Sequence, residues 1–165
     1  MDLLLRKALA DDFQEIASVH HNAWLETYSN LLPKDFLDNR SLESSIRIFK
    51  NNHCVDTVVA VVNGKIVGFC GWGNLRENIF HEELSEIQGI YLLNPLKKNK
   101  IGRRMIEFAL RELRLEGNQK VGLWVLSTNK NAISFYKKIG FTDTGKFREE
   151  YLGQFVIELF FTKDL

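Results

Sequence analysis

Five basic side chains gather where an apolar segment gives way to a polar loop and then to a helical pattern. They are Lys97, Lys98, Lys100, Arg103 and Arg104. A strand that leads through a loop into a helix forms an anion site, because the first helical turn has unpaired amides and the helix dipole is positive there. The cluster therefore predicts a site for a phosphate-bearing ligand, with a solvated charged loop and a nucleic-acid patch as the alternatives.

The overall charge argues against the nucleic-acid alternative. The whole chain carries a formal net charge of +1. No aromatic residues interleave the basic cluster, as they do in many nucleic-acid sites. We therefore expect no nucleic-acid partner.

A second segment with chemical potential spans residues 129–141. Asn129 is a good helix N-cap, and Gly140 supplies the left-handed residue that ends the helix. Apolar residues recur between them at helical spacing: Ala132, Ile133, Phe135, Tyr136 and Ile139. Packing of this helix on the core requires only an aromatic ring at position 136. The hydroxyl of Tyr136 is therefore available either for chemistry or for a hydrogen bond in the core.

The elements around these two segments follow from the hydrophobic pattern. Residues 86–93 predict a strand, which Asn94-Pro95 closes. From Ile101 onward, apolar side chains at positions 105, 106, 109, 110 and 113 form a helical stripe that ends at Gly117. A further strand from Lys120 precedes the helix that begins at Asn129, so a strand leads into a helix twice.

The remaining segments complete a mixed fold. They are a strand at 3–8, a helix capped by Asp11 or Asp12, a second helical region from Pro33 with a break near Asn39, strands at 57–62 and 65–69 around the hairpin signal Asn63-Gly64, and two closing strands. Strands that alternate with helices after a hairpin imply a mixed sheet covered by helices. With 165 residues and 45% hydrophobic content, we expect one domain over residues 1–165.

The pattern Asn-x-x-Ala-x-x-Phe-Tyr-x-x-x-Gly-Phe at 129–141, with the strand 121–126 before it, resembles the C-terminal half of the GNAT superfamily of N-acetyltransferases. In that family the loop matched by residues 97–102 reads Arg or Gln, two residues, Gly, one residue, then Gly or Ala, and it cradles the pyrophosphate of coenzyme A. This chain departs from the pattern at Lys97 and at Lys100, which replaces the first glycine. A lysine there costs about 1 kcal/mol in backbone strain but adds charge beside a diphosphate.

The resemblance implies an α/β (α+β) fold with a mixed, mostly antiparallel twisted sheet of about seven strands and helices on both faces. The strands from Glu86 and Lys120 would run parallel and splay apart around the cofactor. It further implies direct transfer of an acetyl group from acetyl-CoA, the co-substrate, to a primary amine of an unidentified small molecule, peptide or protein. The alternative is a catalytically weak or silent CoA-binding or regulatory module with the same fold.

The resemblance also suggests roles for particular residues. Tyr136 would protonate the leaving thiolate, the Leu92 amide would hold the carbonyl oxygen, and Glu86 would accept the amine proton. The alternatives are a core tyrosine at 136 and an exposed strand-end carboxylate at 86. The implied cofactor-binding residues are Tyr91, Leu92, Lys97, Lys98, Asn99, Lys100, Ile101, Gly102, Arg103, Asn129, Ala132, Phe135 and Tyr136.

The segment Ala23–Tyr28 resembles the wall of the acceptor site in one branch of the family. Trp24 and Tyr28 would line the pocket or simply pack together, since they lie four residues apart. Glu26 is a weaker candidate for the base. We therefore expect an acceptor site beside this segment.

The remaining features of the sequence concern metal binding, cellular location and oligomeric state. The four histidines show no ligand spacing, so we expect no metal. No signal peptide or membrane-length apolar run is evident, and Cys54 and Cys70 are expected to be reduced core residues, which together favour a cytoplasmic protein without membrane attachment. A homodimer is compatible with the family resemblance.

Overall fold

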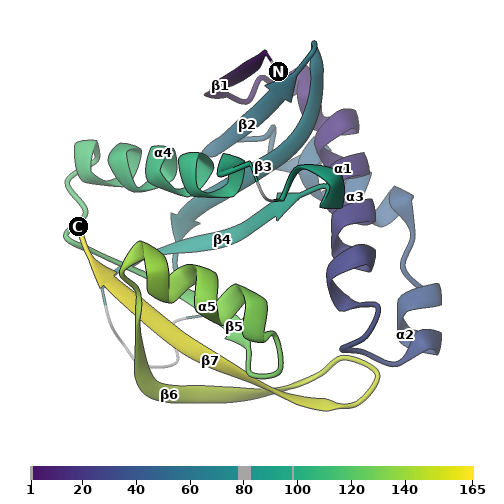
Figure 1. Ribbon diagram of the computed structural model, residues 1–165, viewed down its shortest axis with the longest axis vertical. Coiled ribbons are helices and arrows are strands. Elements are labelled where there is room, and N and C mark those ends of the chain that lie inside the picture. The colour runs from purple at the N-terminus through teal and green to yellow at the C-terminus, as the bar shows by residue number, and fades with distance from the viewer. Residues whose placement is uncertain (1, 78–82, 98) are drawn as a thin grey trace.

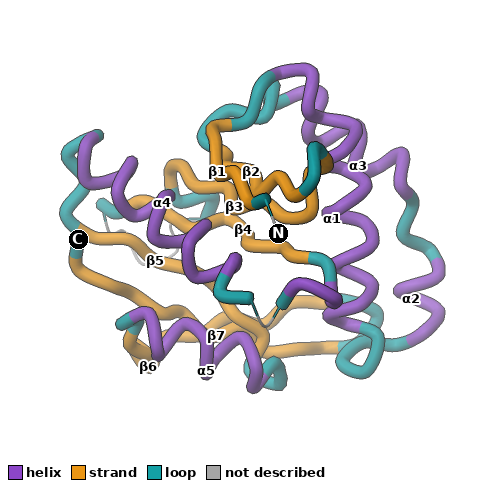
Figure 2. The backbone as a smooth tube through the Cα atoms, turned by 45° about the horizontal axis from the view of Figure 1, so that its top comes forward, coloured by secondary structure: helices purple, strands orange, loops and turns teal. Residues whose placement is uncertain are grey.

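The computed structural model describes residues 2–77, 83–97 and 99–165 (Figure 1). Seven strands form one sheet in the order β1-β2-β3-β4-β5-β7-β6 (Figure 2). The strands are β1 (Leu3–Lys7), β2 (Thr57–Val62), β3 (Lys65–Asn74), β4 (Ser85–Leu92), β5 (Lys120–Leu126), β6 (Thr142–Tyr151) and β7 (Phe155–Asp164). The helices are α1 (Phe13–Tyr28), α2 (Lys34–Asp38), α3 (Leu42–Asn51), α4 (Ile101–Leu115) and α5 (Lys130–Ile139), with short 3-10 turns at Ala10–Asp12 and Asn94–Leu96. The predicted element order and mixed sheet are confirmed.

The splay of the central strands is also confirmed. β4 and β5 are the parallel pair, and they are paired only at Ser85 with Val121 and at Glu86 with Gly122. Immediately afterwards, Gln88 has no opposite residue on β3, because the register shifts there. A bulge of this kind bends its strand, so β4 turns away from β5 after two paired positions.

Helices cover both faces of the sheet. On one face, α4 and α5 pack on a core that includes Val58, Met105 and Tyr136, and both helices lie in front of the sheet in Figure 1. On the other face, α1 and α3 pack on a core that includes Val59 and Phe69. The neighbours Val58 and Val59 enter different cores because successive side chains of a strand point to opposite faces.

The strongest local signals produce the structures they predict. Asn63 and Gly64 both have positive φ, at 50° and 79°, in the β2–β3 hairpin. Gly140 has φ 104° at the end of α5, and the Asn129 side chain accepts a hydrogen bond of 3.2 Å from the Ala132 amide. The stripe along α4 is buried, and Gly117 follows the helix with φ 87°.

The prediction that an aspartate side chain caps the first turn of the first helix is wrong. Asp12 precedes α1, but its carboxylate makes no bond to the first turn of the helix. It accepts hydrogen bonds from the Arg6 guanidinium at 2.6 and 3.0 Å and from the Leu9 amide at 2.8 Å. Asp12 therefore ties the end of β1 to the start of α1.

Candidate functional site

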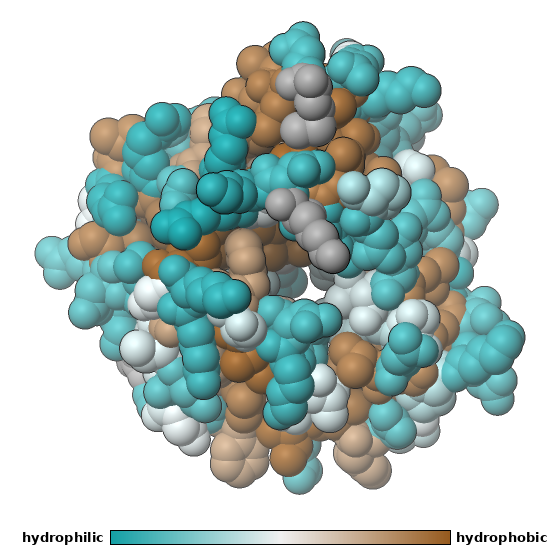
Figure 3. Space-filling model, viewed as in Figure 1, coloured by the Kyte–Doolittle hydropathy of each residue, from teal (hydrophilic) through white to brown (hydrophobic). Residues whose placement is uncertain are grey.

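A cavity of about 1090 Å³ follows the gap between β4 and β5. A hollow is visible near the middle of the face shown in Figure 3. Twelve residues that the sequence singled out line the cavity: Trp24, Glu26, Tyr28, Glu86, Tyr91, Leu92, Lys97, Gly102, Asn129, Ala132, Phe135 and Tyr136. The structure thus brings the predicted cofactor, acceptor and catalytic residues to one space.

Four other predicted cofactor residues do not line this cavity. Ile101 is fully buried in the core, and Arg103 pairs with Glu107 at 2.8 Å on an exposed part of α4. Asn99 and Lys100 lie in the turn that enters α4. Lys98 lies outside the described residues. The four described residues would therefore contact a ligand in this cavity through the backbone of the helix start.

Lys100 begins α4 in an unusual conformation. Its backbone is left-handed, with φ 59° and ψ 8°, which is the geometry that ordinarily selects glycine. Its side chain makes no hydrogen bond to the first turn, since an ammonium group cannot accept one. The first-turn amides of α4, at the positive end of the helix dipole, therefore receive no cap from the side chain of Lys100.

Gly102 keeps the cavity wall beside this turn open. A Cβ at this position would meet the Phe135 ring at 3.7 Å, which is an ordinary contact. Packing within the protein therefore does not require glycine here. Together with Lys97 on the cavity wall, the open backbone fits the diphosphate of a coenzyme A-like ligand.

Leu92 ends β4 with its backbone directed at the gap. Its side chain is buried in the core, as predicted. The next amide, that of Leu93, donates to the Val67 carbonyl on β3 at 3.1 Å. Because successive amides of a strand point in alternate directions, the Leu92 amide points toward the β5 side. The gap thus contains a main-chain donor at the expected place.

Tyr136 lines the cavity from α5. Its ring packs against Phe135 and Phe141, with centroids 5.4 and 5.9 Å apart. Burial raises the pKa of its hydroxyl. The hydroxyl is therefore protonated at neutral pH and can donate a hydrogen bond.

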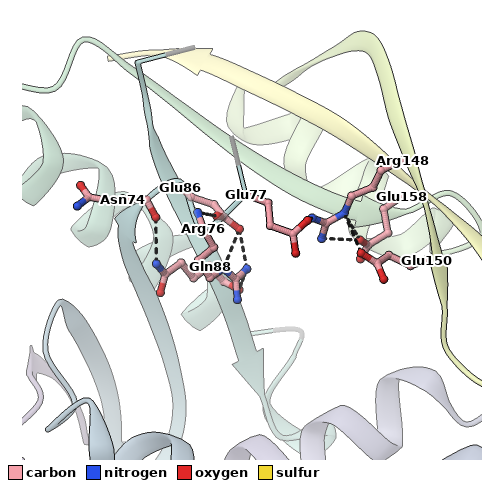
Figure 4. A network of polar contacts seen from close by, with 8 residues as sticks. All are labelled: Asn74, Arg76, Glu77, Glu86, Gln88, Arg148, Glu150 and Glu158. Carbon is pink, nitrogen blue, oxygen red and sulfur yellow. Dashed lines mark hydrogen bonds and ion pairs between the residues drawn. The ribbon is translucent and has the colours of Figure 1, made fainter. Parts of the chain in front are cut away.

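Glu86 is buried, with 1% of its surface exposed, so the exposed strand-end alternative is wrong. One carboxylate oxygen lies 2.6 Å from Nη2 and 3.2 Å from Nε of Arg76, and the other accepts the Arg76 amide at 2.9 Å (Figure 4). Arg76 also donates to the Gln88 carbonyl at 3.1 Å. If Glu86 is the base, its carboxylate must therefore accept the proton while it is still hydrogen-bonded to Arg76.

A second charged group faces the cavity from β6 and β7. Arg148 bonds Glu158 through two nitrogens, at 2.7 and 2.8 Å, and reaches Glu77 at 2.7 Å (Figure 4). Its guanidinium carbon lies 4.2 Å from the centre of the Trp124 ring. The sequence analysis missed this group. The one available signal was Glu158, a lone charge within the apolar run of residues 155–161.

The aromatic side chains of α1 pack against each other and also line the cavity. Trp24 and Tyr28 pack with ring centroids 4.6 Å apart and also line the cavity, so both alternatives for this pair hold. Arg40, which the sequence analysis did not single out, lies over the Trp24 ring at 3.8 Å. Glu26 accepts a 3.0 Å bond from the Asn94 amide, and so α1 holds the beginning of the loop that leads to α4.

Comparison with known proteins decides the family. A model of the acetyltransferase (GNAT) family matches residues 12–141. The chain belongs to the GNAT family of acetyltransferases. This GNAT chain is 27% identical over 134 residues to the uncharacterized N-acetyltransferase YuaI of Bacillus subtilis. The matched region covers 81% of this chain and 76% of YuaI. An uncharacterized N-acetyltransferase of Archaeoglobus fulgidus is 29% identical over 134 residues, 80% of this chain and 88% of that protein.

Solved GNAT structures share the fold over the full length. The PaiA N-acetyltransferase of Thermoplasma acidophilum, in complex with coenzyme A, has a TM-score of 0.78 at 20% identity, with 100% of each chain covered. YncA of Salmonella typhimurium, with acetyl-CoA, has a TM-score of 0.76 at 18% identity, with 100% of this chain and 95% of that chain covered. These likenesses establish the architecture of this GNAT protein.

The described part of this GNAT chain has neither a cluster of metal ligands nor a membrane-length apolar helix. Within residues 2–77, 83–97 and 99–165, no group of three or more His, Cys, Asp and Glu side chains is placed to hold a metal ion. In the same ranges, no helix has the length and apolar character needed to cross a membrane.

Proposed function

We propose that this GNAT protein transfers an acetyl group from acetyl-CoA to a primary amine by direct attack. The observation that carries the proposal is that one cavity connects the start of α4 with the charged and aromatic wall formed by α1, β6 and β7. The coenzyme A and acetyl-CoA in two structures of the same fold support the choice of donor. When bound, acetyl-CoA supplies the thioester carbonyl that the amine attacks.

The cofactor end of the cavity acts through charge and main-chain donors. Lys97 and the first-turn amides of α4 would hold the diphosphate, and Gly102 leaves room for it. The Leu92 amide would donate to the carbonyl oxygen as negative charge develops on it. A donor fixed in place before the reaction is worth about 3 kcal/mol in comparable oxyanion sites.

Tyr136 would stabilise the departing sulfur. A thiol has a pKa of about 8.5, whereas a tyrosine hydroxyl has a pKa of about 10 before any shift. Burial raises the pKa of Tyr136 further, so complete proton transfer to the thiolate is uphill. Its contribution is therefore a hydrogen bond donated to the sulfur as charge accumulates, while the proton stays on Tyr136 and the released thiolate takes its own proton from water.

Glu86 would receive the proton of the amine, directly or through water. Its carboxylate lies at the closed end of the β4–β5 gap and is held by Arg76. Arg76 fixes the orientation of the carboxylate by donating from its guanidinium to one oxygen and from its main-chain amide to the other. Arg76 must therefore share or release one oxygen when the proton arrives.

The alternative candidate is a CoA-binding module of the same fold without turnover. The left-handed Lys100 in the cofactor loop is the observation that favours it, because a strained loop holds a ligand less well. This candidate predicts cofactor binding without acetylation of any amine.

Calorimetric titration of acetyl-CoA tests the first step, with adenosine diphosphate as the control for simple phosphate attraction. We expect saturable one-to-one binding, much tighter than that of the control. Release of free thiol with a panel of amines then tests turnover. Tight binding with no thiol release from any amine would favour the silent module, and no binding would overturn both candidates.

A pair of variants tests the base. Glu86→Gln should lower kcat about 100-fold, within the usual contribution of a general base. Glu43→Gln on the exposed surface of α3 is the matched control and should change nothing. Equal activity of the two variants would remove Glu86 from the mechanism.

A further inference from the structure

The acceptor half of the cavity is densely charged, and most of its charges are paired. Arg76 pairs with Glu86 at 2.6 Å, and Arg148 pairs with Glu158 and Glu77. Glu26 is occupied by the Asn94 amide. Among the residues that the structure describes, no carboxylate or carbonyl partner is found for Arg40, although it lines the same cavity. This guanidinium is thus the cation of the acceptor half that retains its capacity to bind an anion.

Arg40 is held in a geometry suited to an anion. It lies between α2 and α3, and its amide donates to the Leu37 carbonyl at 3.1 Å. Its guanidinium lies over the Trp24 ring, 3.8 Å from the ring centre, and Trp24 is itself packed against Tyr28 and Phe36. Stacking uses the flat face of the guanidinium and leaves its N–H groups free along the edge. An edge of that kind matches the two oxygens of a carboxylate.

The position of Arg40 connects it to the proposed point of transfer. Arg40 stacks on Trp24, and Tyr91 of β4 packs against the same cluster of side chains as Trp24. Tyr91 lines the cavity and directly precedes Leu92. A ligand bound to Arg40 would therefore extend along Tyr91 toward the Leu92 amide.

We propose that the acceptor is an amino carboxylate whose carboxylate group is bound by Arg40. This inference rests on the proposed function and adds the class of its substrate. Glu86, the proposed acceptor of the amine proton, lies on the same cavity as Arg40. Arg40 is therefore a residue that determines specificity, and it takes no part in proton transfer.

The cofactor is a poorer match for Arg40. The phosphate end of the cavity has its own cation, Lys97, beside the open start of α4. Arg40 instead stacks on Trp24 of the aromatic acceptor wall, and it lines the cavity together with Trp24 and Tyr28. An anion bound by Arg40 thus belongs to the acceptor.

Equilibrium binding tests this inference independently of turnover. The wild-type protein saturated with coenzyme A is titrated with matched pairs of an acid and its decarboxylated amine: phenylalanine and phenethylamine, lysine and cadaverine. A dipeptide and its C-terminal amide form a third pair. We expect at least one acid to bind ten or more times more tightly than its partner, which corresponds to about 1.4 kcal/mol.

Variants assign this preference to Arg40. Arg40→Met should erase the acid preference, and Arg40→Lys should restore part of it, because a lysine keeps the charge without the two-pronged geometry. Arg47→Met, on the exposed surface of α3 outside the cavity, is the matched control and should keep the full preference. Coenzyme A affinity, measured for each variant, reports whether its fold is intact.

The possible outcomes separate the two proposals. If no acid binds better than its partner, or if Arg40→Met and Arg47→Met behave alike, the inference is overturned even when amines are acetylated. If acids bind through Arg40 but no amine is ever acetylated, Arg40 is a carboxylate-binding residue, and both the transfer reaction and the acceptor role of the bound acid are overturned.

Discussion

The two helices that follow the splayed strands begin in opposite ways. α5 starts at Asn129, whose side chain accepts from the Ala132 amide, and so the chain itself satisfies the helix end. α4 starts at Lys100, which is left-handed and offers no acceptor to the first turn. The two starts also differ in the side chain that follows: α5 brings the Tyr136 hydroxyl to the cavity, whereas α4 brings the bare backbone of Gly102.

The difference separates two functions within similar strand-to-helix units. A capped helix is stable without a ligand, so α5 can hold a reacting group at a fixed place. An uncapped, positively charged helix start is completed by an anion, so α4 is suited to binding. We therefore expect substitutions in α5 to change kcat or stability, and substitutions at the start of α4 to change the affinity for acetyl-CoA.

The largest expected effect belongs to α5. Tyr136→Phe should lower kcat about 100-fold, because the departing sulfur loses its hydrogen-bond donor. The affinity for acetyl-CoA, measured by calorimetry, should stay within about twofold, a difference of roughly 0.4 kcal/mol. Tyr151→Phe, at an exposed tyrosine of β6, is the control. An unchanged kcat would leave Tyr136 as a core residue.

The next effect belongs to α4. Gly102→Val should weaken acetyl-CoA binding about tenfold or more, or about 1.4 kcal/mol. The reason is that the methyl groups of the valine extend into the space left for the ligand. Gly102→Ala adds a Cβ that the Phe135 ring tolerates, and should raise the free energy of unfolding by about 0.5–1 kcal/mol. Denaturant melts and calorimetry measure both quantities. Equal binding by the valine variant and the wild type would place the ligand elsewhere.

A smaller effect is expected at the start of α5. Asn129→Ala should lower the free energy of unfolding by about 1 kcal/mol through loss of the cap, whereas Asn129→Ser should largely preserve it. Thermal or urea unfolding measures the change. A variant that kept its stability but lost acetyl-CoA affinity would mean that Asn129 serves the ligand, and the contrast between the two helices would disappear.

The smallest expected effect is at Lys100. Lys100→Gly removes about 1 kcal/mol of left-handed strain but gives the unfolded chain more freedom, so a gain of about 0.5 kcal/mol in the free energy of unfolding is expected. Acetyl-CoA affinity should change by less than about threefold, or about 0.7 kcal/mol. Lys100→Asn, which is neutral and tolerates the left-handed angle, separates charge from strain. Marked weakening in both variants would show that the lysine charge is needed.

The parts of this contrast that lie close together in the sequence were predictable. Asn129 and Gly140 predicted α5 because a cap and a left-handed stop act on residues a few positions away. The Asn63-Gly64 turn fixed β2 and β3 for the same reason. Lys100 was identified through its place in a known family pattern, whereas its own residue type gives no hint of a left-handed backbone.

The charged acceptor wall could not be predicted in the same way. Arg40 is distant in sequence from Arg148 and Glu158, which face each other across the β6–β7 hairpin, and the three share a cavity only because α1–α3 and this hairpin border the same gap. No periodicity in the sequence records such a meeting. The ion pair of Glu86 with Arg76 was missed as well, since it joins two residues ten positions apart that no local pattern relates.

The bulge at Gln88 has a consequence for how the protein recognises an extended ligand. By turning β4 away from β5, it creates a sheet edge in the interior of a seven-stranded sheet. Sheet edges recruit any extended molecule that carries amide groups at a suitable spacing, because the main chain supplies the donors and acceptors. Recognition of this kind depends on the geometry of the main chain. It can survive the replacement of most side chains along β4, provided that the bulge is kept.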